Sequence, residues 1–347
     1  METRSVVSIY DTKALEAVRS RNAVQPHRMK LFRNALFKKA CGRDEALDTL
    51  PENARSDFAE HVGFGFLELL ERHDSKIDGA SKLIFKTNDG HLIESVVLRP
   101  ATGRTSICIS SQVGCACYCG FCATGMMGFS RNLTLDEILD QVTQANRMVK
   151  PEGRSIRNVV FMGMGEPLLN PDAVFAAVAF LRAPQFFDLS ASHITVSTVG
   201  IPHAMERFVE TFPKMPLALS LHSARQEVRE KLMPQARKYP LDQLRETLVR
   251  ASASGKVMIE YLMLSGINDG EADLQALIDY LRGIPVHLNI IPFNEFAGSQ
   301  LRGTAQPERE QFAARLKAAG FDTTLRYSLG SDIAAACGQL VQKKRRQ

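Results

Sequence analysis

The 347-residue sequence has no apolar run long enough to span a membrane and no signal-peptide pattern at its N-terminus. We therefore expect a cytoplasmic protein without membrane contacts. Its composition, 45% apolar and 23% charged, is ordinary for a globular chain and allows one large domain with an appendage. Seven cysteines in such a chain favour metal-binding or catalytic thiols over a disulfide framework.

Acidic residues are missing from one stretch near the N-terminus. Between Arg19 and Arg43 there are eight Lys or Arg and no Asp or Glu, and the chain ends in Lys343-Lys-Arg-Arg346. Two basic ends in a chain of net charge +5 fit a polyanionic partner such as RNA. The alternative is a solvated helix face and a frayed tail, and charge alone does not decide between them.

Four cysteines are crowded into eight residues, Cys115-Ala-Cys117-Tyr-Cys119-Gly-Phe-Cys122, with Cys108 seven residues upstream. Thiolates are soft ligands for iron–sulfur clusters, zinc or Cu(I). In one interpretation Cys115, Cys119 and Cys122 ligate three irons of a 4Fe–4S cluster and leave the fourth iron for a substrate. In the other, all four thiols hold zinc, but the second knuckle of a zinc ribbon is absent. The spacing favours iron, and free buried thiols are the third possibility.

The chain before residue 81 is predicted to be helical. An apolar stripe beside a basic face repeats at helical spacing within residues 27–40, and a second helical pattern runs from Ala54 to Arg72. We assign residues 1–80 to a small helical accessory domain. Alternating strands then flank Asn88-Asp89-Gly90, which is typical of a β-hairpin, so residues 81–100 are expected to form a hairpin extension.

After Arg104, apolar strand patterns alternate with helical patterns, which predicts a parallel sheet with right-handed crossovers. The expected strands are Ser106–Ser110, Asn158–Met162, His193–Ser197, Leu217–Leu221, Val257–Leu262 and Val286–Ile291. The expected helices are Leu135–Met148, Pro171–Leu181, Pro202–Phe212, Leu241–Ser252, Glu271–Arg282 and Pro307–Ala319. Thr134 and Glu137 form a capping-box pattern before the first of these helices. Six units are two short of a closed TIM barrel, so we expect an α/β fold with an open partial (βα)6 TIM-type barrel over residues 101–330. A doubly wound sheet is the alternative.

In either fold the active site lies at the carboxyl ends of the strands, where polar residues gather. Gly163-Met-Gly165-Glu166-Pro167 follows one strand; its glycines admit a ligand close to the backbone, and Glu166 offers acceptors to an ammonium group. A tight turn with a solvated Glu is the alternative. Further residues at or just past strand ends are Ser197, Ser220, His222 and Asn294. Cys337 lies in an Ala-rich run, where a small buried apolar residue is the ordinary interpretation.

The stretch Cys115–Cys122 resembles the radical S-adenosylmethionine (SAM) signature. Its longer frame, from Cys108-Ile-Ser-Ser-Gln-Val-Gly-Cys115 to Gly128-Phe-Ser-Arg-Asn-Leu133, is similar to one branch, the RlmN/Cfr family of RNA adenosine methyltransferases. The similarity extends from about residue 20 to Leu340. It recurs in Phe161-Met-Gly-Met-Gly-Glu-Pro167, Ser220-Leu-His222, Ile291-Pro-Phe-Asn294 and Asp332-Ile-Ala-Ala-Ala-Cys-Gly-Gln-Leu340.

The resemblance implies a role for each of these groups. Cys115, Cys119 and Cys122 are expected to ligate a 4Fe–4S cluster, with Cys117 as a spectator and Cys41 as a structural residue. The residues expected to contact SAM are Gly165, Glu166, Pro167, Ser197, Ser220, Leu221, His222 and Asn294. Segment 331–347 is expected to present Cys337 as the methyl carrier, and Cys108 matches the second functional thiol. Glu94 matches the proton acceptor, although its spacing to Cys108 is one residue longer than in the family pattern.

The implied reaction avoids a chemical obstacle, because carbons 2 and 8 of adenine are electron-poor and attack the SAM methyl group poorly. In the family's mechanism Cys337 takes a methyl group from one SAM, and a 5′-deoxyadenosyl radical from a second SAM removes a hydrogen atom from it. The carbon radical adds to adenine, Glu94 removes the ring proton, and Cys108 attacks the Cys337 sulfur, leaving a disulfide. The target adenine has to be unstacked.

The resemblance also implies partners: 23S ribosomal RNA or, in some members, transfer RNA; an electron donor such as flavodoxin or ferredoxin; and a monomeric state with residues 1–80 contacting RNA. The motifs divide between branches that methylate different carbons. Gly165-Glu-Pro-Leu-Leu-Asn170 is similar to the carbon-2 branch, whereas Cys122-Ala-Thr-Gly125 and Leu232-Met-Pro234 are similar to the carbon-8 branch. A non-catalytic zinc-bound RNA-binding protein would explain the cysteines and basic ends, but not the Gly-Met-Gly-Glu-Pro motif or Cys337.

Overall fold

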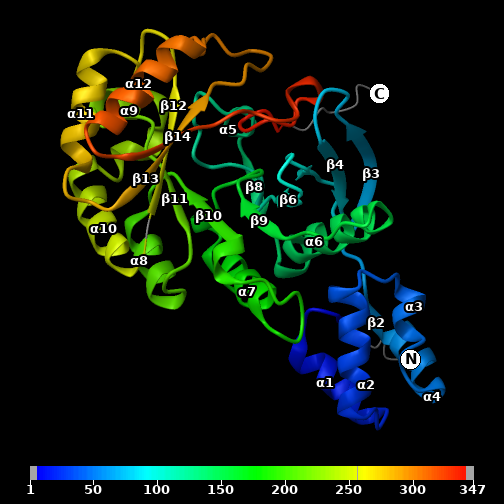
Figure 1. Cartoon of the computed structure of the whole chain (residues 1–347). Coiled ribbons are helices and arrows are strands. Elements are labelled where there is room, and N and C mark those ends of the chain that lie inside the picture. The colour runs from blue at the N-terminus through cyan, green and yellow to red at the C-terminus, as the bar shows by residue number, and fades with distance from the viewer. Residues whose placement is uncertain (1–5, 256, 341–347) are drawn as a thin grey trace.

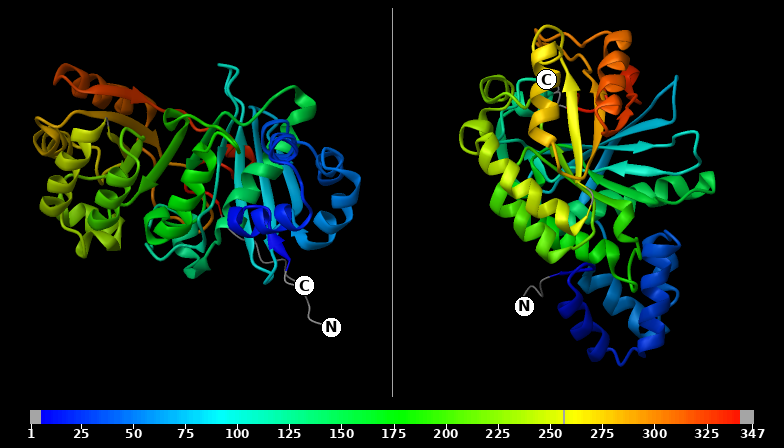
Figure 2. Two further views of the ribbon diagram at one scale, coloured as in Figure 1. Left: turned by 90° about the horizontal axis from the view of Figure 1, so that it is seen from below. Right: turned by 60° about the vertical axis from the view of Figure 1, so that its left-hand side comes forward.

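The computed structural model describes residues 6–255 and 257–340. Its centre is a ten-stranded sheet in the order β14-β13-β12-β11-β10-β9-β6-β5-β4-β3 (Figures 1 and 2). From β6 to β14 the strands are parallel and follow chain order. A doubly wound sheet reverses its strand order at a switch point, whereas this order winds in one direction. The open partial barrel is therefore confirmed, and the doubly wound alternative is wrong.

The predicted β-α units are confirmed to within about two residues at each boundary. The parallel strands are β6 (Ser106–Cys108), β9 (Asn158–Phe161), β10 (Ile194–Thr198), β11 (Leu217–Ser220), β12 (Val257–Met263), β13 (Val286–Pro292) and β14 (Asp322–Leu325). The helices between them are α6 (Leu135–Val149), α7 (Pro171–Arg182), α8 (Pro202–Thr211), α9 (Gln226–Leu232), α10 (Leu241–Ser254), α11 (Glu271–Leu281) and α12 (Gln306–Ala318). Strand β14 and helix α9 are additions to the predicted set. Figure 1 shows α8, α10 and α11 along the outer side of the sheet.

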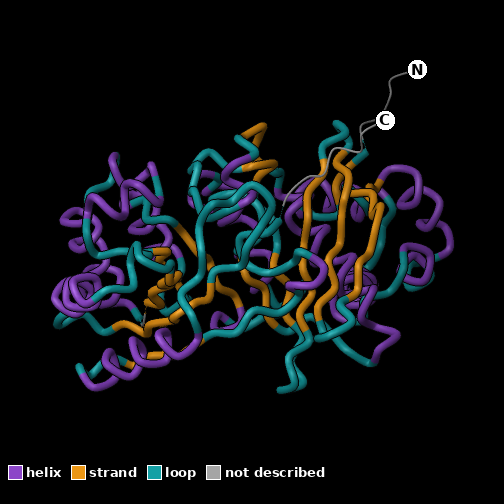
Figure 3. The backbone as a smooth tube through the Cα atoms, turned by 90° about the horizontal axis from the view of Figure 1, so that it is seen from above, coloured by secondary structure: helices purple, strands orange, loops and turns teal. Residues whose placement is uncertain are grey.

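Three antiparallel strands, β3 (Leu67–Asp74), β4 (Ala80–Thr87) and β5 (Leu92–Leu98), extend the sheet beyond β6. The β4–β5 hairpin is the predicted one, and Figure 3 shows the three strands side by side. The helical prediction for Ala54–Arg72 is wrong after His61, where helix α4 ends. Leu and Glu in residues 67–71 favour a helix in isolation, but pairing with β4 decides the conformation.

The N-terminal part is helical as far as His61. It contains α1 (Thr12–Arg21), α2 (Pro26–Arg33), a π-helical turn (Asn34–Lys38), α3 (Arg43–Leu47) and α4 (Glu52–His61), and strand β1 (Val7–Ser8) pairs with β2 (Val62–Gly63). Aromatic rings join these helices to α7 and the segment after it: the Phe37 ring packs edge-on against Phe180 and Phe186 at 5.5 and 5.4 Å between centroids. The helices therefore share an apolar core with the barrel.

The C-terminal segment runs from β14 across the molecule to the turn between β3 and β4 (Figure 1). Asp332 accepts hydrogen bonds from Ser75 Oγ at 2.8 Å and Lys76 N at 3.0 Å, and Gly330 N donates to Asp78 at 2.7 Å. These contacts bridge the two edges of the open sheet. The predicted basic tail, 343–346, lies outside the described residues. No helix in the described part of the chain has the length and apolarity to cross a membrane.

Helix α6 begins with the predicted capping box. Thr134 Oγ1 accepts from Glu137 N at 3.2 Å, and Glu137 Oε2 accepts from Thr134 N at 2.9 Å. Thr134→Ala should lower the free energy of unfolding by about 1 kcal/mol in urea denaturation, because it leaves a helix N–H without its acceptor. Thr134→Ser keeps the oxygen and should match the wild type; equal stability of all three proteins would contradict a role for the cap.

Candidate active site

The cysteine loop, defined here as Cys115–Cys122, is enclosed by a small hairpin. Strands β7 (Gln112–Gly114) and β8 (Phe129–Asn132) pair antiparallel, and Cys115 N donates to Gly128 O at 2.8 Å. A Cβ on Gly114 would lie 2.0 Å from that same oxygen, so only glycine permits this closure. The short helix α5 (Ala123–Met126) continues the chain after the loop.

The thiols of this loop are mostly buried, and they shift one another's pKa values. Burial and the neighbouring thiols Cys122 and Cys115 raise the pKa of Cys119. Cys117 donates from its backbone N to Cys115 Sγ at 3.5 Å, and hydrogen bonding from Cys117 lowers the pKa of Cys115. Cys117, predicted to be a spectator, thus has a donor role toward Cys115. Without a metal, burial therefore favours the protonated form of Cys119.

The Gly-Met-Gly-Glu-Pro motif lies directly after β9, against the cysteine loop. Glu166 is 3% exposed, and its carboxylate accepts from Val199 N at 2.9 Å and Leu168 N at 3.0 Å. Burial raises the pKa of Glu166 to about 7. Gly165 has a φ of +97°, and a Cβ there would lie 2.5 Å from the Gln112 side chain. The solvated-Glu alternative is wrong.

His222 lies just past β11 and contacts the cysteine loop. Its ring packs edge-on against Phe121, with centroids 4.7 Å apart, and its Nδ1 accepts from Leu262 N at 3.0 Å. This bond places the ring proton on Nε2. Burial, followed by the charge of Arg229, lowers the pKa of His222 to about 3. Ser220 and buried Leu221 precede it, and Ser220 pairs with Glu260 of β12. Half-buried Ser197 of β10 pairs with Ala218 of β11.

The C-terminal segment presents Cys337 beside the cysteine loop. Ala123 N donates to Gly338 O at 2.7 Å, and Asn294 Nδ2 donates to Cys337 O at 3.1 Å. The Cys337 side chain is exposed, so the small-buried-residue interpretation is wrong. Burial and the proximity of Cys337 raise the pKa of the Cys108 thiol. The two thiols, 229 positions apart in sequence, therefore lie near each other.

Glu94 belongs to the same region. Val96 pairs with both Lys82 and Cys108, so Lys82, Glu94 and Cys108 share one face of the sheet. Glu94 is 3% exposed, and Lys82 Nζ lies 3.8 Å from its Oε1. Glu94 therefore does not face solvent. Lys82 Nζ also donates to Ala334 O at 3.3 Å, which joins this face to the C-terminal segment.

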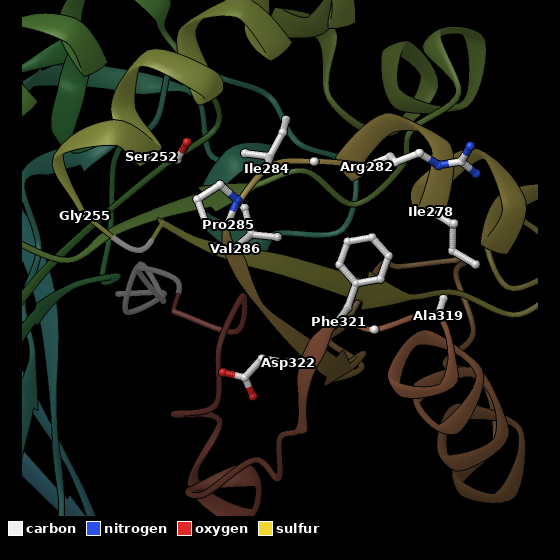
Figure 4. Close-up of a pocket in the computed structure, with 12 residues that line it drawn as sticks. Ser252, Gly255, Ile278, Arg282, Ile284, Pro285, Val286, Ala319, Phe321 and Asp322 are labelled. Carbon is white, nitrogen blue, oxygen red and sulfur yellow. The ribbon is translucent and has the colours of Figure 1, made fainter.

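A hollow of about 870 Å³ lies away from these groups (Figure 4). Its lining includes Ile284–Val286 and Phe321–Asp322, at the amino ends of β13 and β14. The predicted site residues lie at the carboxyl ends, where parallel sheets place their active sites. The hollow is therefore distinct from the candidate active site.

Comparisons with known proteins agree with this geometry. A family model, the radical SAM superfamily, matches residues 109–281. A probable RNA methyltransferase of Rhodopirellula baltica is 46% identical over 344 residues, 98% of this chain and 89% of that protein. A probable dual-specificity RNA methyltransferase RlmN of Chlorobium chlorochromatii is 41% identical, over 93% of this chain and 90% of that protein. The chain belongs to the RlmN/Cfr family of radical SAM RNA methyltransferases.

The overall fold also matches a solved family relative. A radical SAM methyltransferase from Sphaerobacter thermophilus aligns with a TM-score of 0.91 and 34% identity, over 96% of this chain and 99% of that chain. A radical SAM RNA methyltransferase uses a 4Fe–4S cluster and SAM. The soft thiol donors of the cysteine loop fit such a cluster chemically. Among the described residues no three Cys, His, Asp or Glu side chains surround one ion position; the ligands of a four-iron cluster bind different irons and lie farther apart.

Sequence reasoning missed two residues that shape this site. Arg229, on helix α9, is 1% exposed beneath the cysteine loop, and Phe121 packs on His222. Helix α9 has only seven residues, and the buried position of an arginine has no signal in sequence periodicity. A resemblance in short motifs predicts which residues bind the cofactors, but it does not predict the residues that pack behind them.

Without its metal cluster, this protein should have a free energy of unfolding that depends on pH because of His222. Its pKa is about 3 when folded and near 6.5 when unfolded. As the pH falls below about 6.5, the unfolded state binds a proton that the folded state does not, so stability is lost. Between pH 6 and 5 the wild type should lose about 1 kcal/mol of unfolding free energy more than His222→Gln does.

Urea denaturation of the metal-free proteins at each pH measures this difference. His27→Gln, on an exposed position of α2, is the matched control and should keep the pH dependence of the wild type. Parallel pH profiles for the wild type and His222→Gln would contradict a buried neutral imidazole.

Proposed function

We propose that the chain methylates carbon 2 or carbon 8 of an adenine in RNA, through an S-methyl group on Cys337. The observation that carries this proposal is the convergence of Cys337, Cys108 and Glu94 beside the cysteine loop. They come from the C-terminal segment, β6 and β5. A zinc-bound RNA-binding protein has no need for two such thiols and a buried carboxylate.

The cysteine loop holds the cofactors in this proposal. Cys115, Cys119 and Cys122 would hold the 4Fe–4S cluster, which would supply the electron for reductive cleavage of SAM. Glu166, as a carboxylate, receives the SAM amino group. The contacts to the rest of SAM come from the motif around Glu166 and from the ends of β10, β11 and β13: Gly165, Pro167, Ser197, Ser220, Leu221, His222 and Asn294.

Cys337 is suited to carry a methyl group because the residue is exposed while its backbone is fixed. Asn294 and Ala123 hold the carbonyl groups of Cys337 and Gly338, so the sulfur is presented from a fixed loop. After a first SAM methylates the Cys337 thiolate by displacement, a second SAM provides the radical that removes a hydrogen atom from the S-methyl group. Two SAM molecules are consumed in each turnover.

Glu94 and Cys108 complete the reaction. Glu94 lies 3.8 Å from the Lys82 ammonium group, on the same face of the sheet as Cys108, and is placed to remove the adenine ring proton. Burial keeps Cys108 protonated at rest, which protects it until the adduct forms. Once the radical adduct has lost its ring proton to Glu94 and one electron to an oxidised electron carrier such as the proposed flavodoxin or ferredoxin, the Cys108 thiolate attacks the Cys337 sulfur. The carbon–sulfur bond breaks with its electron pair on the methylene carbon, which takes up a proton from solvent, so the methylated adenine is released and a disulfide between the two cysteines remains.

We further propose 23S ribosomal RNA as the substrate, with transfer RNA second, and flavodoxin or ferredoxin as the reductant of a monomeric enzyme. The basic N-terminal helices support RNA contact. Some of their basic side chains form salt bridges within the chain: Arg21 pairs with Asp57 at 2.6 Å, and Lys38 pairs with Asp188 at 2.9 Å. Exposed Lys30 and Lys39 are therefore better placed for phosphate contacts.

The ligand assignment is tested by two neighbouring thiols. Cys119→Ala removes a ligand and should abolish the brown colour, the bound iron and methyl transfer in anaerobically prepared protein. Cys117→Ala keeps the backbone donor to Cys115 and should retain the cluster and most of the activity. Loss of the cluster in Cys117→Ala alone would replace the proposed ligand set.

The order of steps is tested by the two catalytic thiols. Cys337→Ala should carry no S-methyl group and form no product, with the cluster intact. Cys108→Ala should stop after the carbon–carbon bond forms and trap RNA on Cys337, seen as a gel band that survives denaturation and disappears with nuclease. Normal turnover of Cys108→Ala, or an RNA adduct on Cys337→Ala, would contradict these roles.

A further inference from the structure

Arg229 lies on helix α9, buried beneath the cysteine loop, with carbonyl oxygens as hydrogen-bond acceptors. Its Nε donates to Leu221 O at 3.1 Å, and its Nη2 donates to Val199 O at 2.5 Å and Ser220 O at 3.5 Å. These carbonyl groups belong to the ends of β10 and β11. Arg229 thus fixes the two strand ends that are proposed to contact SAM.

Carbonyl groups orient a guanidinium but do not neutralise its charge. Among the described residues, the salt bridges around α9 involve Arg225, Glu227, Glu230, Arg237 and Asp273, but not Arg229. Burial lowers the pKa of Arg229 only to about 10, so it is a cation at neutral pH. A buried charge without a counter-charge costs several kcal/mol. The carbonyl acceptors offset part of this cost, but in the described part of the chain no carboxylate forms a salt bridge with Arg229.

Helix α9 packs directly on the cysteine loop. Val228 and Leu232 share an apolar cluster with Cys119, and Leu232 O accepts from Gly120 N at 3.0 Å. The acidic groups that act on Arg229 electrostatically are Tyr280 and Cys119. Burial raises the pKa of Tyr280, so its hydroxyl is neutral. The remaining group, Cys119, becomes an anion when it ligates iron.

We propose that Arg229 is a positioning residue whose buried charge stabilises the reduced cluster and raises its reduction potential. The inference rests on the proposed ligand set Cys115, Cys119 and Cys122. One added electron makes a cluster with three thiolate ligands more negative, so a fixed cation beside it favours the reduced form over the oxidised form. Net charge around a cluster is one of the main determinants of its potential.

The test is a potentiometric titration of anaerobically reconstituted full-length protein without SAM, followed by electron paramagnetic resonance of the reduced cluster. Arg229→Met should lower the ratio of reduced to oxidised cluster at least tenfold at a fixed potential, which is about 59 mV for one electron. Arg229→Lys keeps the charge and should stay near the wild-type potential.

Arg245→Met is the matched control. Arg245 also donates to carbonyl oxygens, Tyr280 O at 2.8 Å and Arg282 O at 3.1 Å, but Arg282 lines the hollow at the amino ends of the strands, opposite the site. Its removal should leave the cluster potential unchanged. A shift as large as that of Arg229→Met would mean that arginine loss acts through general loosening, and would overturn the inference.

Two further readouts separate the possible failures. Wild-type protein without iron and sulfide would refute the proposed ligand set itself. If Arg229→Met binds a full complement of iron and sulfide and its cluster has the wild-type reduction potential, only the inference about Arg229 is overturned. This holds even if the variant binds SAM more weakly. If Arg229→Met does not fold, Arg229→Lys decides: a wild-type potential supports a charge effect, and a tenfold lower ratio contradicts it.

Discussion

The geometry of the site depends on how the cysteine loop is held by three parts of the chain, two of them distant in sequence. Its backbone is hydrogen-bonded to Gly128 of the β7–β8 hairpin, to Leu232 of α9 and, through the adjoining Ala123, to Gly338 of the C-terminal segment. Thr124 Oγ1 adds a bond to Leu340 O at 2.6 Å. The bonds to Leu232, Gly338 and Leu340 close over large sequence separations, so the packing of the loop depends on the folding of the barrel and of the C-terminal segment. The same bonds bring Cys337 to the loop.

The topology of the sheet explains why a small number of contacts is enough to assemble the site. Its parallel strands wind in one direction, so their carboxyl ends form one mouth, and a polar residue just past each strand enters the same space. The antiparallel extension adds a second wall, and Glu94 on its strand β5 shares a face with Cys108 on the adjoining strand β6. The C-terminal segment spans both walls through Asp332, Lys82 and Asn294. One family fold thus assembles a cofactor site and a pair of thiols from unrelated stretches of sequence.

Much of this fold could be predicted from sequence because its β-α units have strong, regular hydrophobic periods. The failures have particular physical causes. Strand β3 is an edge strand whose exposed Leu and Glu favour a helix locally, so only pairing with β4 identifies it. Helix α9 and strand β14, with seven and four residues, are too short for a repeated hydrophobic pattern to be distinguished from chance. The sequence predicts the N-terminal helices as a separate accessory domain, but the packing of Phe37 on Phe180 joins them to the core of the barrel.

The site residues also divide into those that the sequence predicts and those that only the structure reveals. Motif resemblance named the thiols, Glu166 and Glu94, whose chemistry is local to a few residues. It did not reveal that Lys82 accompanies Glu94, that Cys117 donates to Cys115, or that Arg229 lies beneath the loop. Each of these follows from tertiary packing, in which a residue's burial and partners are set by segments far away in the chain.

The most direct test of the central claim, methylation through a radical on the Cys337 methyl group, uses SAM with a fully deuterated methyl group and mass spectrometry of the RNA nucleosides. If a deuterium is removed from the Cys337-bound methyl group and solvent later supplies a hydrogen, the methyl group on adenine contains two deuterium atoms. Methyl transfer directly from SAM by displacement would keep all three. A product with three deuterium atoms would contradict the proposed function.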